Sequence, residues 1–168
     1  ADGKMSIFTT LPDGSIQINY SSVYYIGDPC YCFSHNTQTW DGLCDSWFDI
    51  DGGPIAKSNA IEVVGFSTAY GDGNYIGQAD GINYNFPVDS GVLGIVPQEF
   101  IESDSTFGIG SSCGILIELC AGDIIRTING DFSISGSHSI YIKTSYEPDD
   151  WDIECDNTSD FIYNEEHV

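Results

Sequence analysis

The sequence predicts a mostly β protein, either an antiparallel β-sandwich or a partly closed barrel, with one or two short helices. Three observations lead to this prediction: short segments of alternating or apolar residues, 19 glycines that separate such segments, and one segment of helical periodicity. The 168 residues suit one domain, and a 41% hydrophobic composition can supply its core. We therefore expect a single β-rich domain over residues 1–168, ending in an acidic C-terminal segment, 147–168.

The first two strands are predicted as a hairpin. Ser6–Leu11 and Ser15–Tyr20 flank Pro12-Asp13-Gly14, where proline presets φ and glycine accepts a positive φ. Turn residues also separate the later strands, and Asn129-Gly130 is a predicted type I′ turn. The later predicted strands are Val23–Ile26, Ile61–Thr68, Gly114–Cys120, Ile124–Ile128, Asp131–Ser135 and Ser139–Thr144.

One helix is predicted over residues 39–48. Trp40, Leu43, Cys44 and Trp47 recur at helical spacing and form one apolar stripe, which should face the core. Gly42 weakens this helix by about 1 kcal/mol relative to alanine. A second, shorter helical turn is expected around residues 97–101, so the protein should contain far less helix than strand.

The charge of the chain limits its partners. Asp and Glu number 26 and Lys and Arg only four, which gives a formal net charge of −22. Nucleic acids and anionic membranes are bound through clustered Lys and Arg, so we expect neither as a partner. Cations, basic protein surfaces and further copies of the chain, in a homo-oligomer or polymer, are the expected partners.

Six aspartates are candidate metal ligands because they lie in glycine-containing loops or beside them. Their carboxylates suit a hard cation such as Ca²⁺, which takes six to eight oxygen ligands. In the stronger alternative the same carboxylates accept backbone N–H groups and build turns. An EF-hand is excluded, because Gly53 and Ala60 occupy the fifth and twelfth positions from Asp49. The candidates are Asp28, Asp72, Asp89, Asp45, Asp49 and Asp51.

An ordered set of motifs between roughly residues 24 and 98 resembles a family of small uncharacterised proteins from bacteria and phages. The resemblance covers less than half of the chain and leaves the acidic end outside. It implies a compact β-rich domain and no established activity. The motifs are Gly27-Asp28-Pro29-Cys30-Tyr31, Trp40, Cys44-Asp45, Thr68–Gly73 and Val88–Gly91.

The number of cysteines bears on where the protein works, because disulfides form outside the reducing cytosol. Six cysteines could form up to three disulfides, and an extracellular or virion setting, which the sequence slightly favours, would require at least one. Cys155 is the candidate for tethering the acidic segment. The cysteines are Cys30, Cys32, Cys44, Cys113, Cys120 and Cys155.

The expected function is a non-enzymatic structural, self-assembling β domain, such as a virion component or an extracellular filament subunit. Calcium across its acidic surfaces would stabilise the assembly. One alternative is an acidic inhibitor that mimics nucleic acid and binds a basic protein. A second is a hydrolase-like enzyme that uses Asp28, Cys30, His35 and Asp72, with the thiol as nucleophile and the imidazole as base.

Overall fold

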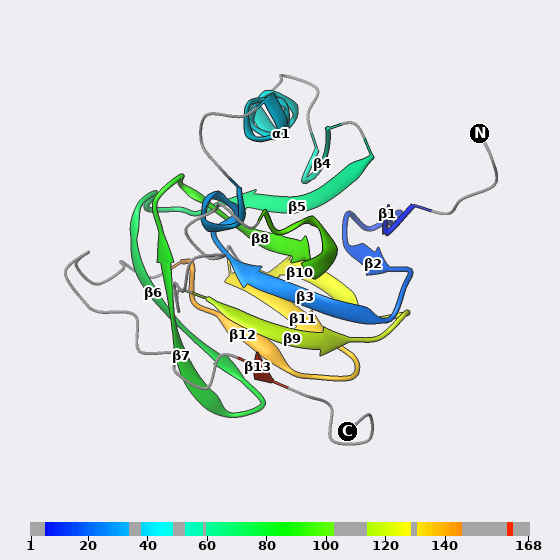
Figure 1. Cartoon of the computed structure of the whole chain (residues 1–168). Helices are drawn as coiled ribbons and strands as arrows, with labels where there is room; N and C mark the ends of the chain where they lie inside the picture. The colour runs from blue at the N-terminus through cyan, green and yellow to red at the C-terminus, as the bar shows by residue number, and fades with distance from the viewer. Residues whose placement is uncertain are drawn as a thin grey trace.

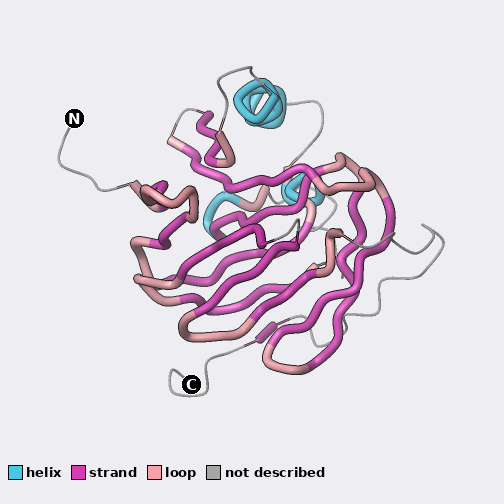
Figure 2. Tube along the Cα trace, turned by 180° about the vertical axis from the view of Figure 1, so that it is seen from behind, coloured by secondary structure: helices cyan, strands magenta, loops and turns pink. Residues whose placement is uncertain are grey.

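Two β-sheets packed face to face form the body of the protein (Figure 1). The computed structural model describes residues 6–33, 38–48, 53–58, 60–102, 114–128, 131–145 and 161–162. Neither sheet closes on itself, so the predicted sandwich is confirmed and the partly closed barrel is not formed. The same two layers are seen from behind in Figure 2.

The larger sheet has seven strands in the order β1-β2-β10-β11-β12-β6-β7. Every neighbouring pair in it is antiparallel. Two of its hairpins join strands that are adjacent in sequence at the sheet edges, whereas β2 meets β10 across more than a hundred residues. The strands are β1 (Phe8–Thr10), β2 (Ile16–Ile18), β10 (Ile124–Ile128), β11 (Asp131–Ser135), β12 (Ile140–Ile142), β6 (Gly73–Ala79) and β7 (Ile82–Val88).

The smaller sheet has six strands in the order β13-β9-β3-β8-β5-β4. Its neighbours are antiparallel except β13, which pairs in parallel with β9. β13 is the part of the acidic segment 147–168 that the structure describes. The strands are β13 (Phe161–Ile162), β9 (Ile115–Leu119), β3 (Ser22–Gly27), β8 (Val92–Pro97), β5 (Ile61–Ser67) and β4 (Ile55–Ser58).

The main core lies between the sheets and follows from strand periodicity. Alternate residues of a strand point to one face, so the apolar residues of the seven-stranded sheet turn inward while polar ones turn outward. The inward residues are fully buried against those of the other sheet. They include Ile16, Ile125, Phe132 and Phe86 on one side and Ile26, Ile95 and Ile117 on the other.

A second, smaller core covers the outer face of the six-stranded sheet. Helix α1 (Gln38–Phe48) lies over β4 and β5 there (Figure 1). Its predicted stripe is confirmed: Leu43 is fully buried, and Trp40 and Trp47 are partly buried against the same cluster. Trp47 Nε1 also donates to the carbonyl oxygen of Pro54 at 3.1 Å, which ties the helix to the segment before β4.

Two short 3₁₀ helices complete the fold. η1 (Pro29–Cys32) follows β3, and η2 (Gln98–Phe100) follows β8 and confirms the helical turn predicted there. None of the helices that the structure describes is long and apolar enough to cross a bilayer. The predicted type I′ turn at Asn129-Gly130 lies outside the described residues.

Candidate functional site

Two of the motifs that carry the resemblance, Gly27–Tyr31 and Val88–Gly91, meet at one buried carboxylate. Asp28 follows β3 and is 0% exposed. Its Oδ1 accepts hydrogen bonds from Cys30 N at 2.8 Å and Ser90 Oγ at 2.7 Å. Its Oδ2 accepts from Asp89 N at 2.6 Å and Ser90 N at 2.7 Å. Asp28 therefore joins the start of η1 to the loop between β7 and β8.

Burial raises the pKa of Asp28, and the hydrogen bonds from Ser90, Cys30 and Asp89 oppose that rise. With four donors on two oxygens, the carboxylate is well satisfied where it lies. A metal ion would have to displace some of these bonds. This geometry favours the prediction that Asp28 builds a turn over the prediction that it ligates a cation.

A third motif, Thr68–Gly73, joins the same end of the sandwich, whereas Trp40 and Cys44-Asp45 lie on α1. Thr68 N donates to the carbonyl oxygen of Gly91 at 3.0 Å, next to the residues that Asp28 holds. Thr68 Oγ1 and the Tyr75 hydroxyl both donate to the carbonyl oxygen of Gly71, at 2.6 and 2.8 Å. Three motifs that are far apart in sequence thus form one hydrogen-bonded loop cluster.

The other predicted metal ligands do not converge on Asp28. Asp72 and Asp89 are exposed on the loop cluster, and Asp45 is exposed on α1. Asp49 and Asp51 lie outside the described residues. Among the residues that the structure describes, no three carboxylate, cysteine or histidine side chains come together as a metal ion would require. A calcium site in this region stays a prediction.

Four cysteines carry reduced thiols: Cys30 and Cys32 are buried, and Cys44 and Cys120 are partly exposed. Burial, reinforced by the charge of Asp28, raises the pKa of the Cys30 and Cys32 thiols well above the usual range. A nucleophilic cysteine needs a lowered pKa, so these thiols suit a structural role better than a catalytic one. The proposed base, His35, lies outside the described residues, as do Cys113 and Cys155.

The cysteine geometry gives a prediction for thiol titration. We expect at least four reactive thiols per chain under denaturing, non-reducing conditions, because none of the four described cysteines is in a disulfide. In the native protein, Cys30 and Cys32 should react far more slowly than Cys44, since they are buried and weakly acidic. A count below four would mean that at least one of these four cysteines is in a disulfide. A native protein whose thiols all react at one rate would contradict the burial.

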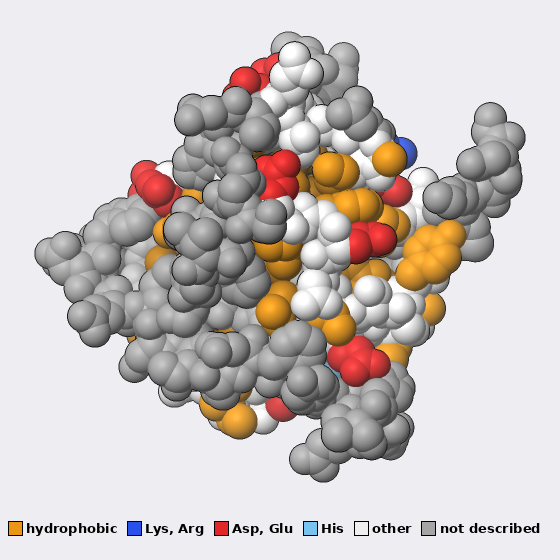
Figure 3. Space-filling model, in the orientation of Figure 1, with side chains coloured by type: hydrophobic (Ala, Val, Ile, Leu, Met, Phe, Trp, Pro, Cys, Tyr) orange, Lys and Arg blue, Asp and Glu red, His pale blue; other side chains and the backbone are white. Residues whose placement is uncertain are grey.

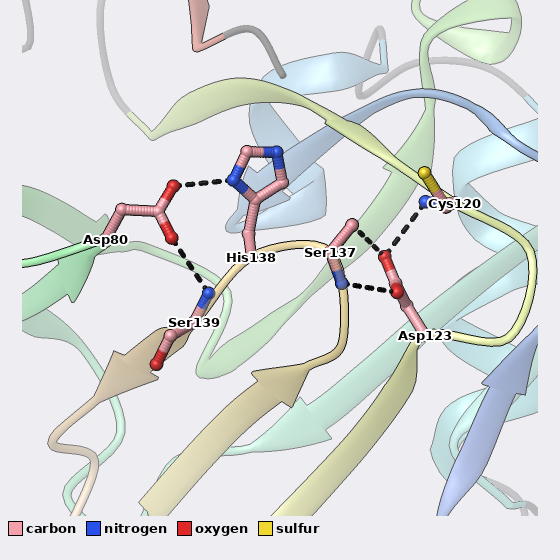
Figure 4. A network of polar contacts seen from close by, with 6 residues as sticks. All are labelled: Asp80, Cys120, Asp123, Ser137, His138 and Ser139. Carbon is pink, nitrogen blue, oxygen red and sulfur yellow. Dashed lines mark hydrogen bonds and ion pairs between the residues drawn. The ribbon is translucent and has the colours of Figure 1, made fainter. Parts of the chain in front are cut away.

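A second polar cluster, not anticipated from the sequence, lies where β6 ends and β12 begins (Figure 4). Asp80 Oδ2 lies 2.5 Å from His138 Nδ1, and Asp80 Oδ1 accepts from Ser139 N at 2.9 Å. Asp80 has φ of +53° and Gly81 has φ of +86°, the two left-handed residues of a type I′ turn between β6 and β7. The contacts of Asp80 with His138 and Ser139 therefore tie this turn to the segment before β12.

His138 has one ring nitrogen oriented by a carboxylate, as in a general-base dyad. Its Nε2 is buried and has no hydrogen-bond partner among the described residues. The nearby Ser137 hydroxyl donates to Asp123 Oδ2 at 2.5 Å, and Asp123 also accepts from Ser137 N and Cys120 N (Figure 4). The Ser137 hydroxyl is therefore hydrogen-bonded to Asp123. Like the cluster around Asp28, this cluster holds loops together.

Asp131 is a third buried aspartate with this role. Its carboxylate accepts hydrogen bonds from the Tyr141 hydroxyl and from both Ser145 N and Ser145 Oγ. Burial alone would raise the pKa of Asp131, but the bonds from Ser145 and Tyr141 outweigh it and hold the pKa below its usual range. The ionised carboxylate thereby ties β11 to β12 and to the residues that follow β12.

One hollow among the described residues has a volume of about 230 Å³. It lies at the turn between β1 and β2, is lined by Asp13, Gly14, Ser15, Arg126 and Thr127, and is open to solvent. Ligand pockets usually enclose about 300–1,000 Å³ and bury most of the ligand. This hollow is too small and open to be a strong candidate for a substrate site.

The chain was compared with known proteins at three levels. No protein-family model, curated protein or solved structure matches it. The resemblance to small bacterial and phage proteins, which rests on the motifs around Asp28, therefore stays a prediction from the sequence. The structure adds that three of those motifs, Gly27–Tyr31, Thr68–Gly73 and Val88–Gly91, share one hydrogen-bonded cluster.

Proposed function

We propose that this chain is a non-enzymatic structural domain that self-assembles, in the manner of a virion component or an extracellular filament subunit. The observation that carries the proposal is the uneven distribution of acidic residues. Of the 26 in the chain, the seven strands of the larger sheet contain only Asp131. Arg126 lies in the same sheet, and Lys143 directly follows β12.

This distribution favours assembly because copies that each carry a charge of −22 repel one another. Two copies can approach most easily where acidic side chains are few. In the view of Figure 1, β3 and β9 pass in front of β10 and β11, and acidic side chains are scattered over the side shown in Figure 3. The strands of the larger sheet contain one acidic residue, against Glu62 and Glu118 in the smaller sheet and Asp41 and Asp45 on the α1 helix that covers it, so the larger sheet offers the less repulsive contact surface.

The polar groups of the described residues favour a structural role. Asp28, Asp80, Asp123 and Asp131 each accept hydrogen bonds from a loop distant in sequence. The buried thiols of Cys30 and Cys32 have raised pKa values. The aspartates thus connect loops and the thiols stay protonated, which suits a structural domain.

Light scattering over a range of ionic strength tests the proposal. Raising the salt from about 0.01 M to about 1 M shortens the Debye length from about 30 Å to about 3 Å and should screen the repulsion between copies. We expect the measured mass to exceed the 18.3 kDa of one chain and to increase with salt. A monomer at every salt concentration and at high protein concentration would refute self-assembly.

The same experiment tests calcium. If acidic surfaces of neighbouring copies share Ca²⁺, adding the ion at low salt should increase the mass and a chelator should reverse the change. Mg²⁺ at equal concentration is the control, because it screens charge similarly but keeps its waters more strongly. Equal masses with both ions would remove calcium from the proposal and leave assembly by screening.

A further inference from the structure

The outer face of the seven-stranded sheet carries a row of polar side chains that are neutral except for Arg126. Cross-strand register places Gln78 opposite both Asn83 and Tyr141, Tyr141 opposite Ser133, and Ser133 opposite Arg126. These residues alternate with the buried core residues of the same strands, so they point outward. We call Asn83, Gln78, Tyr141, Ser133 and Arg126 the amide row.

Apolar groups lie on this face as well. Ile76, two residues from Gln78 on the same face of β6, is 47% exposed, and Tyr141 is 40% exposed. The Tyr141 hydroxyl is bonded to Asp131, which fixes the ring in the row. Burial of such side chains supplies the main driving force of protein association, and tyrosine is enriched in interfaces.

The charge of the face is close to neutral. Its one strand carboxylate, Asp131, is buried beneath Tyr141 and accepts three hydrogen bonds from within the chain. Arg126 and Lys143 offset that charge on the same side of the molecule. A partner with the same net charge can therefore approach the strands of this face with few carboxylates opposed, since the exposed Asp13 and Asp80 lie at turns beyond the strand ends.

The row is also complementary to itself. An amide side chain both donates and accepts hydrogen bonds, so Gln78 and Asn83 of one copy can bond to the same residues of another. In a two-fold interface the same surface of each copy meets its equivalent, which is the commonest symmetry of soluble dimers. A row of amides suits that symmetry, whereas a row of carboxylates would not.

We propose that two copies of this chain pack face to face through the amide row, with Ile76 and Tyr141 as the apolar contacts. This inference rests on the proposed function and names the contact surface. The seven strands have between 3 and 7 residues each, and at about 3.4 Å of rise per residue and about 4.8 Å between strands they give a face of about 540 Å² in projection. Protruding side chains enlarge the accessible area towards the roughly 800 Å² per partner of a standard interface.

Isosteric charge substitutions provide the test. The double variant Gln78→Glu/Asn83→Asp adds two negative charges to the row without changing side-chain size. The matched control, Gln38→Glu/Gln98→Glu, adds the same charge on α1 and η2, and all four residues are exposed. Sedimentation equilibrium at a fixed salt concentration would measure the dimer dissociation constant, with near-ultraviolet circular dichroism to verify that each variant is folded.

We expect the Gln78→Glu/Asn83→Asp pair to raise the dissociation constant by at least about tenfold, because two-fold symmetry places four new charges in one interface. The control pair should change it by less than about threefold. If both pairs of substitutions weaken the dimer equally, or if neither changes the dissociation constant of a protein that assembles, the amide row is not the contact surface. The proposed function would then still stand. A wild-type protein that is monomeric under all conditions would overturn both.

Discussion

Replacing Asp28 with alanine is expected to lower the free energy of unfolding by about 3–5 kcal/mol. The substitution removes the acceptor of four hydrogen bonds, and three of the donors are backbone N–H groups, at Cys30, Asp89 and Ser90. Asp28 is fully buried, so water cannot replace the lost acceptor without opening the loop cluster. An unsatisfied buried donor costs about 1–3 kcal/mol, and loop relaxation recovers part of the sum.

A graded series separates the contribution of the carboxylate from that of its partners. Ser90→Ala removes one hydroxyl bond, while the backbone N–H of residue 90 still donates. Asp28→Asn keeps one acceptor oxygen and turns an amide N–H₂ towards other donors. We expect the loss in the free energy of unfolding to increase from Ser90→Ala to Asp28→Asn and to be largest for Asp28→Ala. Urea unfolding with a common slope measures all three.

Two results would contradict this role for Asp28. A loss below about 1 kcal/mol for Asp28→Ala would mean that the loops are held by other contacts. A loss that appears only when Ca²⁺ is present would mean that Asp28 acts as a metal ligand rather than as an acceptor of N–H groups. The measurements should therefore be made with calcium and with chelator.

The sequence predicted part of this cluster. Asp28 before Pro29 is a turn signal, and its bond to Cys30 N is the local contact that such a signal indicates. The bonds to Asp89 and Ser90 cross 61 and 62 residues. Those bonds depend on the pairing of β3 with β8, which sets the loop beside Asp28. No local pattern encodes that pairing, so the sequence left turn building and metal binding both open.

Strands β4, β6, β7, β8 and β13 were not predicted from the sequence, and for the first four of these strands the cause can be identified. β4 is short, and β8 is buried along its whole length, so neither shows the alternation that marks a half-buried strand. β7 contains Pro87, which is tolerated because β7 forms a sheet edge in the described structure. The Asp80-Gly81 dipeptide between β6 and β7 is a strong hairpin signal that could have identified both strands.

The surface properties of the larger sheet could not be obtained from the sequence. Apart from the acidic segment 147–168, the acidic residues are spread along the chain, and no segment of the sequence is set apart as a neutral surface. The amide row exists only because β10, β11, β12, β6 and β7 become neighbours in a particular register. Strand order and register arise from the packing of the whole core, which places these side chains in line.

Gly94→Ala is the second substitution with a large expected effect, a loss of about 3 kcal/mol or more in the free energy of unfolding. Gly94 lies in β8 opposite Gly65 of β5. A Cβ atom at position 94 would lie 1.8 Å from the carbonyl oxygen of Val64 and 2.9 Å from its carbonyl carbon. Both atoms belong to the backbone of a central strand, so the clash can be relieved only by separating β5 from β8.

Two other glycines serve as controls for that prediction. At Gly65 a Cβ would meet side-chain atoms of Trp47 and Val92 at 2.7 Å, and these can shift, so Gly65→Ala should cost less than Gly94→Ala. At Gly53 no atom lies within 4 Å, so Gly53→Ala should leave stability within about 1 kcal/mol of wild type or raise it. Thermal unfolding of the three variants would rank them. Equal stability of the residue 94 and residue 53 variants would show that β5 and β8 do not approach as closely as the register implies.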